Sequence, residues 1–379
     1  MRSSTDISPL RAETESIAFL HAPDEGRALV NQLRGRHPLF ACVIASTDTA
    51  LIPGISAAGA SPELIPFTAA ADAEVLAWGS ARCIPGLPCN PLGPPGPALI
   101  TLAALQLADI PHVVVNTGCR INPESPYFEL GVRPGGIISD GNAVSNAGEL
   151  FHQGRALGHE LATQCDYLVL GESVPGGTTT ALALLLALGI SAEGRISSSL
   201  AGNPHELKTR VASDALRHLA PDAVAADPLA AVATLGDPMQ AAAAGIAAGA
   251  SDRGVSVLLA GGTQMIAVLA LLHRLARAGQ AALPGKTLAV ATTRWVVEDP
   301  TADAVGLMHD VGTEPLLATN LCFATSRHPG LRSYEAHLVK EGVGAGGVAI
   351  AASLADGVTC SEIMERVECL YDAILAGVP

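Results

Sequence analysis

The most informative segment of the chain reads Leu168-Val169-Leu170-Gly171-Glu172-Ser173-Val174-Pro175-Gly176-Gly177-Thr178-Thr179-Thr180. An apolar run ends here in glycines and hydroxyl residues, and residues 181–189 after it are apolar over the length of a short helix. The pattern predicts a strand, a tight loop and the start of a helix. Such a loop collects backbone N–H groups at the positive end of a helix, where anions and phosphates in particular bind. Because Thr178 follows Gly177 where a Walker A loop has lysine, the segment predicts a phosphorylated ligand and argues against an ATPase.

Further short apolar runs indicate buried parallel strands, at residues 40–44, 112–116, 167–170, 255–260 and 287–292. Helical patterns lie between them, for example at 150–161 and 264–278. This alternation predicts the α/β class, with a doubly wound, mostly parallel, Rossmann-like sheet and helices on both faces. Ligands in such sheets bind at the carboxyl ends of the strands. That edge would carry Asn116, the 171–177 loop, Gly261 with Gly262, and the loop after residue 292.

Composition and charge limit the classes of function. The chain has 379 residues, of which 49% are hydrophobic and only 15% charged, so it can bury a large core, and we expect one domain over 1–379. A net charge of −14 disfavours nucleic acid as a partner. The longest apolar run, near 181–190, is about half a membrane span, and residues 1–6 precede no apolar signal core. We therefore expect no membrane association and a cytoplasmic location, with the eight cysteines reduced.

A second glycine cluster reads Lys340-Glu341-Gly342-Val343-Gly344-Ala345-Gly346-Gly347, ahead of an apolar, helix-compatible run at 348–354. Gly342, Gly344 and Gly347 satisfy G-x-G-x-x-G, but no clear strand precedes them and only 32 residues follow, so a dinucleotide site is not expected. One interpretation is a helix start at which glycines permit close packing. The other is a backbone cradle with Glu341 at its edge as a proton acceptor.

The remaining motifs do not indicate a metal site. His159-Glu160 and His205-Glu206 each lack the second histidine of a zinc protease, and no Cys/His cluster compensates, so no metal is expected. Lys208 and Arg210 follow Gly202-Asn203-Pro204, near an expected helix start. Basic residues in such places are usually solvated, and a phosphate contact is the alternative.

Two segments resemble a known family. Residues 171–181 are similar to the G-E-M-G-I-x-N-T-T-x-A segment of nicotinate-nucleotide–dimethylbenzimidazole phosphoribosyltransferases, the CobT enzymes of cobalamin assembly, and residues 341–346 to their E-G-x-G-x-G segment. Val255–Gly261 resembles their V-P-V-L-L-D-G strand and turn, and Glu206–Leu216 a segment whose basic residue falls on Arg210. Residues 47–60 and 69–74 resemble a divergent branch from archaea and cyanobacteria. Ser173 replaces methionine, Gly177 replaces asparagine, and Ala260 replaces aspartate.

The resemblance implies a reaction and a set of site residues. Phosphoribose would pass from nicotinate mononucleotide to a benzimidazole-type base, with Glu341 as general base and no cofactor. The phosphate and nucleotide would contact Gly176, Gly177, Thr178, Thr179, Thr180, Arg210, Gly261, Gly262, Gly342, Gly344 and Gly346. The base would contact Glu172, Ser173, Val174 and Asn116. The family is dimeric, so the resemblance implies a homodimer here, and it has a small helical part built from its termini. In this chain the run at 17–20 looks more like a strand.

Alternatives to this function stay open at the level of sequence. The acceptor could be adenine or another purine base, with the same chemistry. The fold could also bind a nucleotide or a cobamide precursor without turnover, because the departures at residues 173, 177 and 260 fall near the expected site. A hydride-transfer enzyme is the weakest alternative.

Overall fold

The computed structural model describes residues 16–90, 92–200, 202–282 and 287–376, so residues 1–6 lie outside the described part. Its centre is an eight-stranded sheet in the order β1-β8-β7-β6-β5-β2-β3-β4. The strands are β1 (Ile17–His21), β2 (Pro38–Ile44), β3 (His112–Asn116), β4 (Phe128–Glu129), β5 (Tyr167–Ser173), β6 (Ser256–Ala260), β7 (Leu288–Thr293) and β8 (Leu316–Thr319). All neighbouring pairs are parallel except β1 with β8.

The sheet confirms the predicted α/β class and its strands. The five apolar runs form β2, β3, β5, β6 and β7, and the run beginning at Ile17 forms β1. The sequence did not indicate β8 and β4, which are only four and two residues long. The chain enters β5 between β2 and β6, so the segment 168–180 starts in the middle of the sheet and leaves it at the carboxyl edge.

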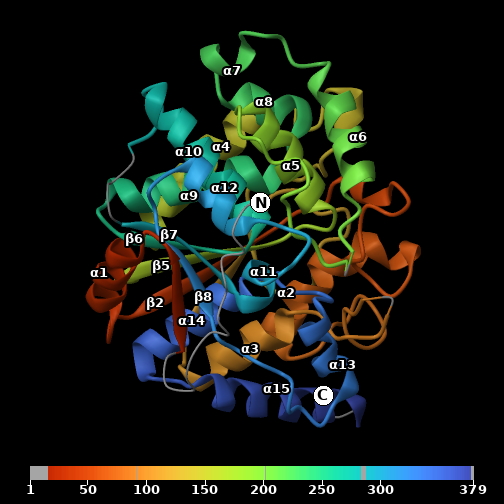
Figure 1. Cartoon of the computed structure of the whole chain (residues 1–379), viewed down its shortest axis with the longest axis vertical. Coiled ribbons are helices and arrows are strands. Elements are labelled where there is room, and N and C mark those ends of the chain that lie inside the picture. The colour runs from red at the N-terminus through yellow and green to blue at the C-terminus, as the bar shows by residue number, and fades with distance from the viewer. Residues whose placement is uncertain (1–15, 91, 201, 283–286, 377–379) are drawn as a thin grey trace, which may run out of the picture.

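Helices cover both faces of this sheet (Figure 1). One face carries α4 (Ala147–Leu161), α5 (Gly177–Ala187), α6 (His205–Leu216), α7 (Ala223–Ala226), α8 (Leu229–Leu235), α9 (Pro238–Asp252), α10 (Thr263–Arg277) and α12 (Ala304–Val311). The other carries α2 (Thr68–Trp78), α3 (Ala98–Leu107), α14 (Ala345–Asp356) and α15 (Cys360–Leu375). The remaining helices are α1 (Pro23–Leu33), α11 (Arg294–Val297), α13 (Pro329–Arg332) and the 3₁₀ turns η1 (Asp48–Leu51), η2 (Pro62–Phe67), η3 (Ile138–Asp140) and η4 (Ser333–Ala336).

Each face of the sheet has its own apolar core. Close packing in the first core depends on glycine: a Cβ on Gly154 would lie 2.4 Å from the carbonyl oxygen of Ala242, and one on Gly245 would lie 2.2 Å from that of Phe151. Helices α4 and α9 therefore approach with their backbones almost in contact. The alanine-rich stretch 223–250 forms three helices and not one, because prolines at 228 and 238 start new ones.

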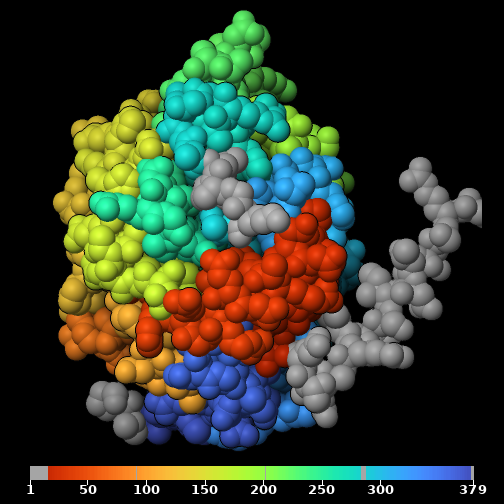
Figure 2. All heavy atoms as spheres, turned by 90° about the vertical axis from the view of Figure 1, so that its left-hand side faces the viewer, coloured from red at the N-terminus to blue at the C-terminus, as the bar shows by residue number. Residues whose placement is uncertain are grey.

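The edge strand β1 is shielded by its own following segment. Figure 2 shows the N-terminal part of the described chain, in red, across the middle of one side of the molecule, with the C-terminal helices in blue below it. There, Gly26 of α1 packs against Phe19 of β1 and Leu317 of β8. Among the described residues, no helix is both long and apolar enough to cross a bilayer.

Candidate functional site

A cavity opens where β5 ends. Its empty space is about 840 Å³, including the open mouth, which suits a small-molecule ligand. The walls come from segments distant in sequence: the end of β5 with the start of α5, the loop before α14, helix α2, and loop residues 55–59, 88–90, 96–97 and 198–200. Predicted site residues on these walls are Glu172, Ser173, Val174, Gly176, Gly177, Thr178, Glu341 and Gly342. The two glycine-rich segments therefore meet around one space.

The first turn of α5 forms one end of the cavity. Gly176 has φ 79°, and a Cβ there would lie 2.9 Å from the Cα of Ala50. Both the backbone conformation and the lack of space therefore require glycine at this position. Gly177 begins the helix, and Thr178 lines the cavity. The N–H of Gly177 already donates to the carbonyl of Val174 and that of Thr179 to the carbonyl of Gly176, so the positive end of the helix dipole is what favours anions here.

Lys208 adds a positive charge beside that helix start. Its side chain is fully buried, and its Nζ donates a hydrogen bond to Thr178 Oγ1 at 2.5 Å. Burial, with a smaller contribution from the charge of Lys340, lowers the pKa of Lys208 to about 7. Arg210, the predicted phosphate contact, is exposed and does not line the cavity. Lys208 shares the buried face of α6 with Val211, Ala212 and Ala215, and helical spacing could have distinguished it from Arg210.

Glu341 lies at the second glycine cluster, and both oxygens of its carboxylate accept hydrogen bonds. Its Oε2 accepts from the N–H of Thr293 at 2.9 Å and from Thr292 Oγ1 at 3.3 Å. Its Oε1 accepts from the N–H of Gly342 at 3.1 Å, and the N–H of Gly346 in the first turn of α14 lies 3.3 Å from both oxygens. Burial raises the pKa of Glu341 to about 7, although these hydrogen bonds favour the ionised form. A carboxylate with a pKa near 7 in a cavity is suited to accept a proton.

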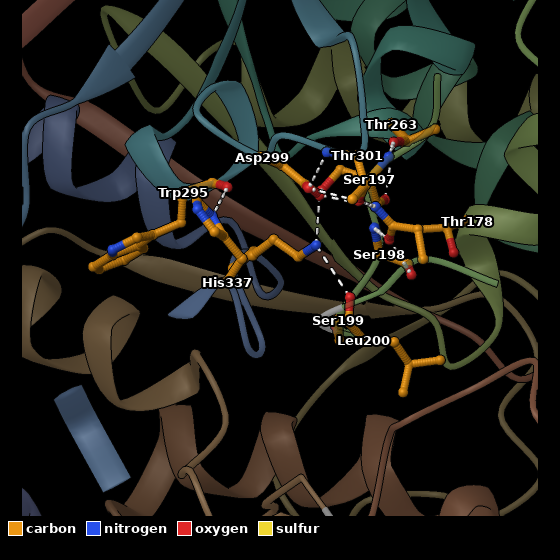
Figure 3. Close-up of polar contacts among 12 residues, drawn as sticks. Thr178, Ser197, Ser198, Ser199, Leu200, Thr263, Trp295, Asp299, Thr301 and His337 are labelled. Atoms are coloured by element: carbon orange, nitrogen blue, oxygen red, sulfur yellow. Dashed lines mark hydrogen bonds and ion pairs between the residues drawn. The ribbon is translucent and has the colours of Figure 1, made fainter. Parts of the chain in front are cut away.

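A buried ion pair fixes the loop that carries Glu341. Lys340 Nζ donates to Asp299 Oδ2 at 2.5 Å and to the carbonyl oxygen of Leu200 at 3.2 Å, and both charged side chains are essentially inaccessible. Figure 3 shows Asp299 beside Ser197 and Thr301, which also hydrogen-bond to it. Burial opposes ionisation of Asp299, but the hydrogen bonds from Lys340 and Thr301 outweigh it and hold the pKa well below its usual range.

The backbone of this loop is unusual. His337, Val339, Lys340 and Val343 all have positive φ angles, between 55° and 73°, which residues with a Cβ rarely adopt. Hydrogen bonds from neighbouring elements hold it: the N–H of Val343 donates to the carbonyl of Glu172 on β5, and Thr293 Oγ1 donates to the carbonyl of Lys340. The strand β7 and the ion pair together therefore set the position of the Glu341 carboxylate.

Two carboxyl groups extend the acidic side of the cavity. Burial, assisted by the charges of Asp237 and Glu341, raises the pKa of Glu172 to about 8. Asp72, on α2, accepts a hydrogen bond from Ser173 Oγ at 2.7 Å. Asp72 was not among the predicted site residues. In the sequence it stands out only as an acidic residue within a run of alanines. The cavity therefore has one end at the start of α5, where Lys208, itself off the cavity wall, hydrogen-bonds to the lining residue Thr178, and another end lined by carboxyl groups.

Several predicted site residues do not line the cavity, and the structure gives them other contacts. Asn116 Oδ1 accepts from the N–H groups of Gly118 and Cys119. Thr179 and Thr180 are buried in α5, where Thr180 hydrogen-bonds to Asp237 at 2.5 Å. Gly261 packs against Met265 and Gly262 against Val296.

Gly344 and Gly346 are also absent from the cavity walls, and both are close-packing positions. A Cβ on Gly344 would lie 3.2 Å from the Cα of Gly171, and one on Gly346 would lie 2.1 Å from the carbonyl carbon of Thr292. The close-packing interpretation of the second cluster therefore holds for these two glycines. Gly346 serves the site indirectly, because its N–H donates to Glu341.

A known protein family and two related proteins match this chain. A family model described as Phosphoribosyltransferase matches residues 98–307. A UPF0284 protein of Gloeobacter violaceus is 46% identical over 94% of this chain and 93% of its own length. A UPF0284 protein of Methanothermobacter thermautotrophicus is 41% identical over 91% of this chain and 96% of its own.

Solved structures share the fold. The nicotinate-nucleotide–dimethylbenzimidazole phosphoribosyltransferase of Thermus thermophilus superposes with a TM-score of 0.58 at 18% identity, covering 94% of each chain. A second structure, CobT of the same organism, gives 0.57 at 18% identity, covering 90% of this chain and 93% of its own. These matches agree with the resemblance drawn from the two glycine-rich segments.

Proposed function

This chain belongs to the UPF0284 family and is a phosphoribosyltransferase, and from that premise we propose that it transfers phosphoribose from nicotinate mononucleotide to a benzimidazole-type or purine base. One observation carries the proposal: Glu341 and the start of α5 line the same cavity. A phosphate end and a proton acceptor on opposite segments are what such a transfer needs.

The phosphate end is assigned to the first turn of α5. Its N–H groups and the nearby ammonium of Lys208 would stabilise the 5′-phosphate of the nucleotide. Lys208 Nζ hydrogen-bonds to the neutral hydroxyl of Thr178, and a phosphate bound there would give the buried ammonium a negative counter-charge. The ribose would then extend towards Glu341.

Glu341 would act as the general base. A ring nitrogen of the acceptor attacks C1′, the bond from C1′ to the pyridinium nitrogen breaks, and its electron pair returns to nicotinate. The acceptor's N–H proton passes to the Glu341 carboxylate. Because nicotinate leaves from a pyridinium cation, its departure needs no acid, and a single base is sufficient.

The test is release of nicotinate from its mononucleotide in the presence of a panel of acceptors, including dimethylbenzimidazole, benzimidazole and adenine. We expect stoichiometric nicotinate and α-riboside phosphate with at least one of them. Tight binding of the mononucleotide without release under every acceptor would contradict the enzyme and favour a binding protein of the same fold.

Replacing Lys208 by methionine should raise the KM for nicotinate mononucleotide roughly tenfold to a hundredfold, because a hydrogen-bonded charge near the phosphate is lost. The chain should remain folded, since methionine fills similar space without a buried charge. Arg210→Met is the matched control two residues away, and its KM should be unchanged because Arg210 is exposed. A larger effect at Arg210 than at Lys208 would place the phosphate elsewhere.

The rate should depend on pH through two groups. Glu341, with its pKa raised to about 7, must lose a proton to act, whereas Lys208, with its pKa lowered to about 7, must keep one to attract phosphate. We therefore expect a bell-shaped profile of kcat/KM for the nucleotide, with its maximum near pH 7. At saturating nucleotide, bound phosphate favours charged Lys208, so kcat should keep the acidic limb and lose the basic one. A kcat that falls above pH 7 would contradict this assignment.

A further inference from the structure

The carboxyl group of Asp72 has an oxygen for which the described part of the chain supplies no hydrogen-bond partner. Asp72 lies on α2 among fully buried alanines, is itself only 4% exposed, and lines the cavity. Its Oδ2 accepts from Ser173 Oγ at 2.7 Å, whereas Oδ1 is buried without a hydrogen-bond partner among the described residues. An unsatisfied buried acceptor is destabilising, so its presence in a cavity wall indicates that a ligand satisfies it.

The surroundings of Asp72 suit a ligand that donates hydrogen bonds. Ser173 uses its hydroxyl proton on Asp72 and so holds the carboxyl in place. Glu172, adjacent to Ser173, lines the same cavity, and Thr68 lies one helical turn before Asp72. This wall of the cavity is therefore polar. A heterocycle with only methyl substituents would leave Oδ1 unpaired.

We propose that Asp72, held by Ser173, determines specificity by accepting a hydrogen bond from an amino substituent of the acceptor base. The inference rests on the proposed function and narrows its acceptor to amino-substituted heterocycles, such as aminopurines or aminobenzimidazoles. Asp72 binds the ring at a distance from the bond that forms, so it selects the base, whereas Glu341 takes the proton. A site built to bind such a donor discriminates strongly against an analogue that lacks it.

The wild-type chain can be tested with acceptors that differ only in amino against methyl. The pairs are adenine with 6-methylpurine, and 5-aminobenzimidazole with 5-methylbenzimidazole. Calorimetric Kd values without nucleotide should favour the amino compound roughly tenfold to a hundredfold in at least one pair. Equal Kd values in both pairs would overturn the inference. This measurement needs no turnover, so a failure to release nicotinate contradicts only the proposed function.

Variants then assign the preference to Asp72. Asp72→Leu should reduce the ratio of the affinities for the amino and the methyl compound to about one. The affinity for the methyl compound should be kept or improved. Glu63→Leu removes a carboxylate from the neighbouring turn η2, where Glu63 is exposed and lies off the cavity wall; it is the matched control, and its ratio should stay at the wild-type value. Ser173→Ala should lower the ratio partially, because the Asp72 carboxyl loses the hydrogen bond from Ser173 that holds it in place. A preference that persists unchanged in Asp72→Leu would overturn the assignment.

Discussion

Replacing Glu341 by glutamine should lower kcat by roughly two to four powers of ten, the usual contribution of a general base. Glutamine has the same shape and can still accept from Thr293 N–H, but it cannot take a proton from the acceptor. The binding of nicotinate mononucleotide should change little, because the proposed phosphate site lies at α5 and not at Glu341. Single-turnover release of nicotinate would measure the chemical step, and calorimetry would measure binding.

The control for this prediction is Glu206→Gln, on the exposed side of α6, which should keep full activity. Wild-type kcat in Glu341→Gln would exclude Glu341 as the base. A loss of nucleotide binding without a loss of the chemical step would instead give the carboxylate a structural role, through the donors that gather around it.

Replacing Lys340 by methionine should reduce the free energy of unfolding by about 3–5 kcal/mol, because Asp299 would keep its charge in a buried site without a counter-ion. Asp299 would still accept from Ser197 and Thr301, but these neutral donors do not cancel the charge. Urea denaturation followed by tryptophan fluorescence provides the measurement, since Trp295 is fully buried near this loop.

The double variant Lys340→Met with Asp299→Asn tests the reason for that loss. Removing the stranded charge should recover a large part of the stability, because asparagine can keep hydrogen bonds to Ser197 and Thr301. Additive losses in the double variant would mean that the two residues contribute independently and that the ion pair is not what holds the loop.

The central strands could be predicted from the sequence because strands buried on both faces of a parallel sheet are continuous apolar runs. The edges carry weaker signals: β8 has only four residues and β4 two. The helix breaks within 223–250 were readable from Pro228 and Pro238, which begin new helices rather than interrupt one.

The sequence indicated those cavity residues that lie in contiguous segments. It did not indicate the residues that tertiary contacts bring to the cavity. Gly176 and Glu341 belong to recognisable local segments. The pairing of Lys340 with Asp299 joins residues 41 positions apart, and that of Ser173 with Asp72 joins residues 101 apart. No local pattern encodes such pairs. Arg210 was preferred to Lys208 although the helical period assigns only Lys208 to the buried face.

The left-handed backbone of residues 337–343 has a consequence for catalysis. Each non-glycine residue in that conformation costs of the order of 1–3 kcal/mol, and here hydrogen bonds with β5, β7 and Asp299 hold the loop that contains four of them. The protein's own contacts therefore set the position of Glu341, the proposed proton acceptor. With Glu341 in that role, the binding energy of the substrate would be left for the approach of the two rings to the ribose.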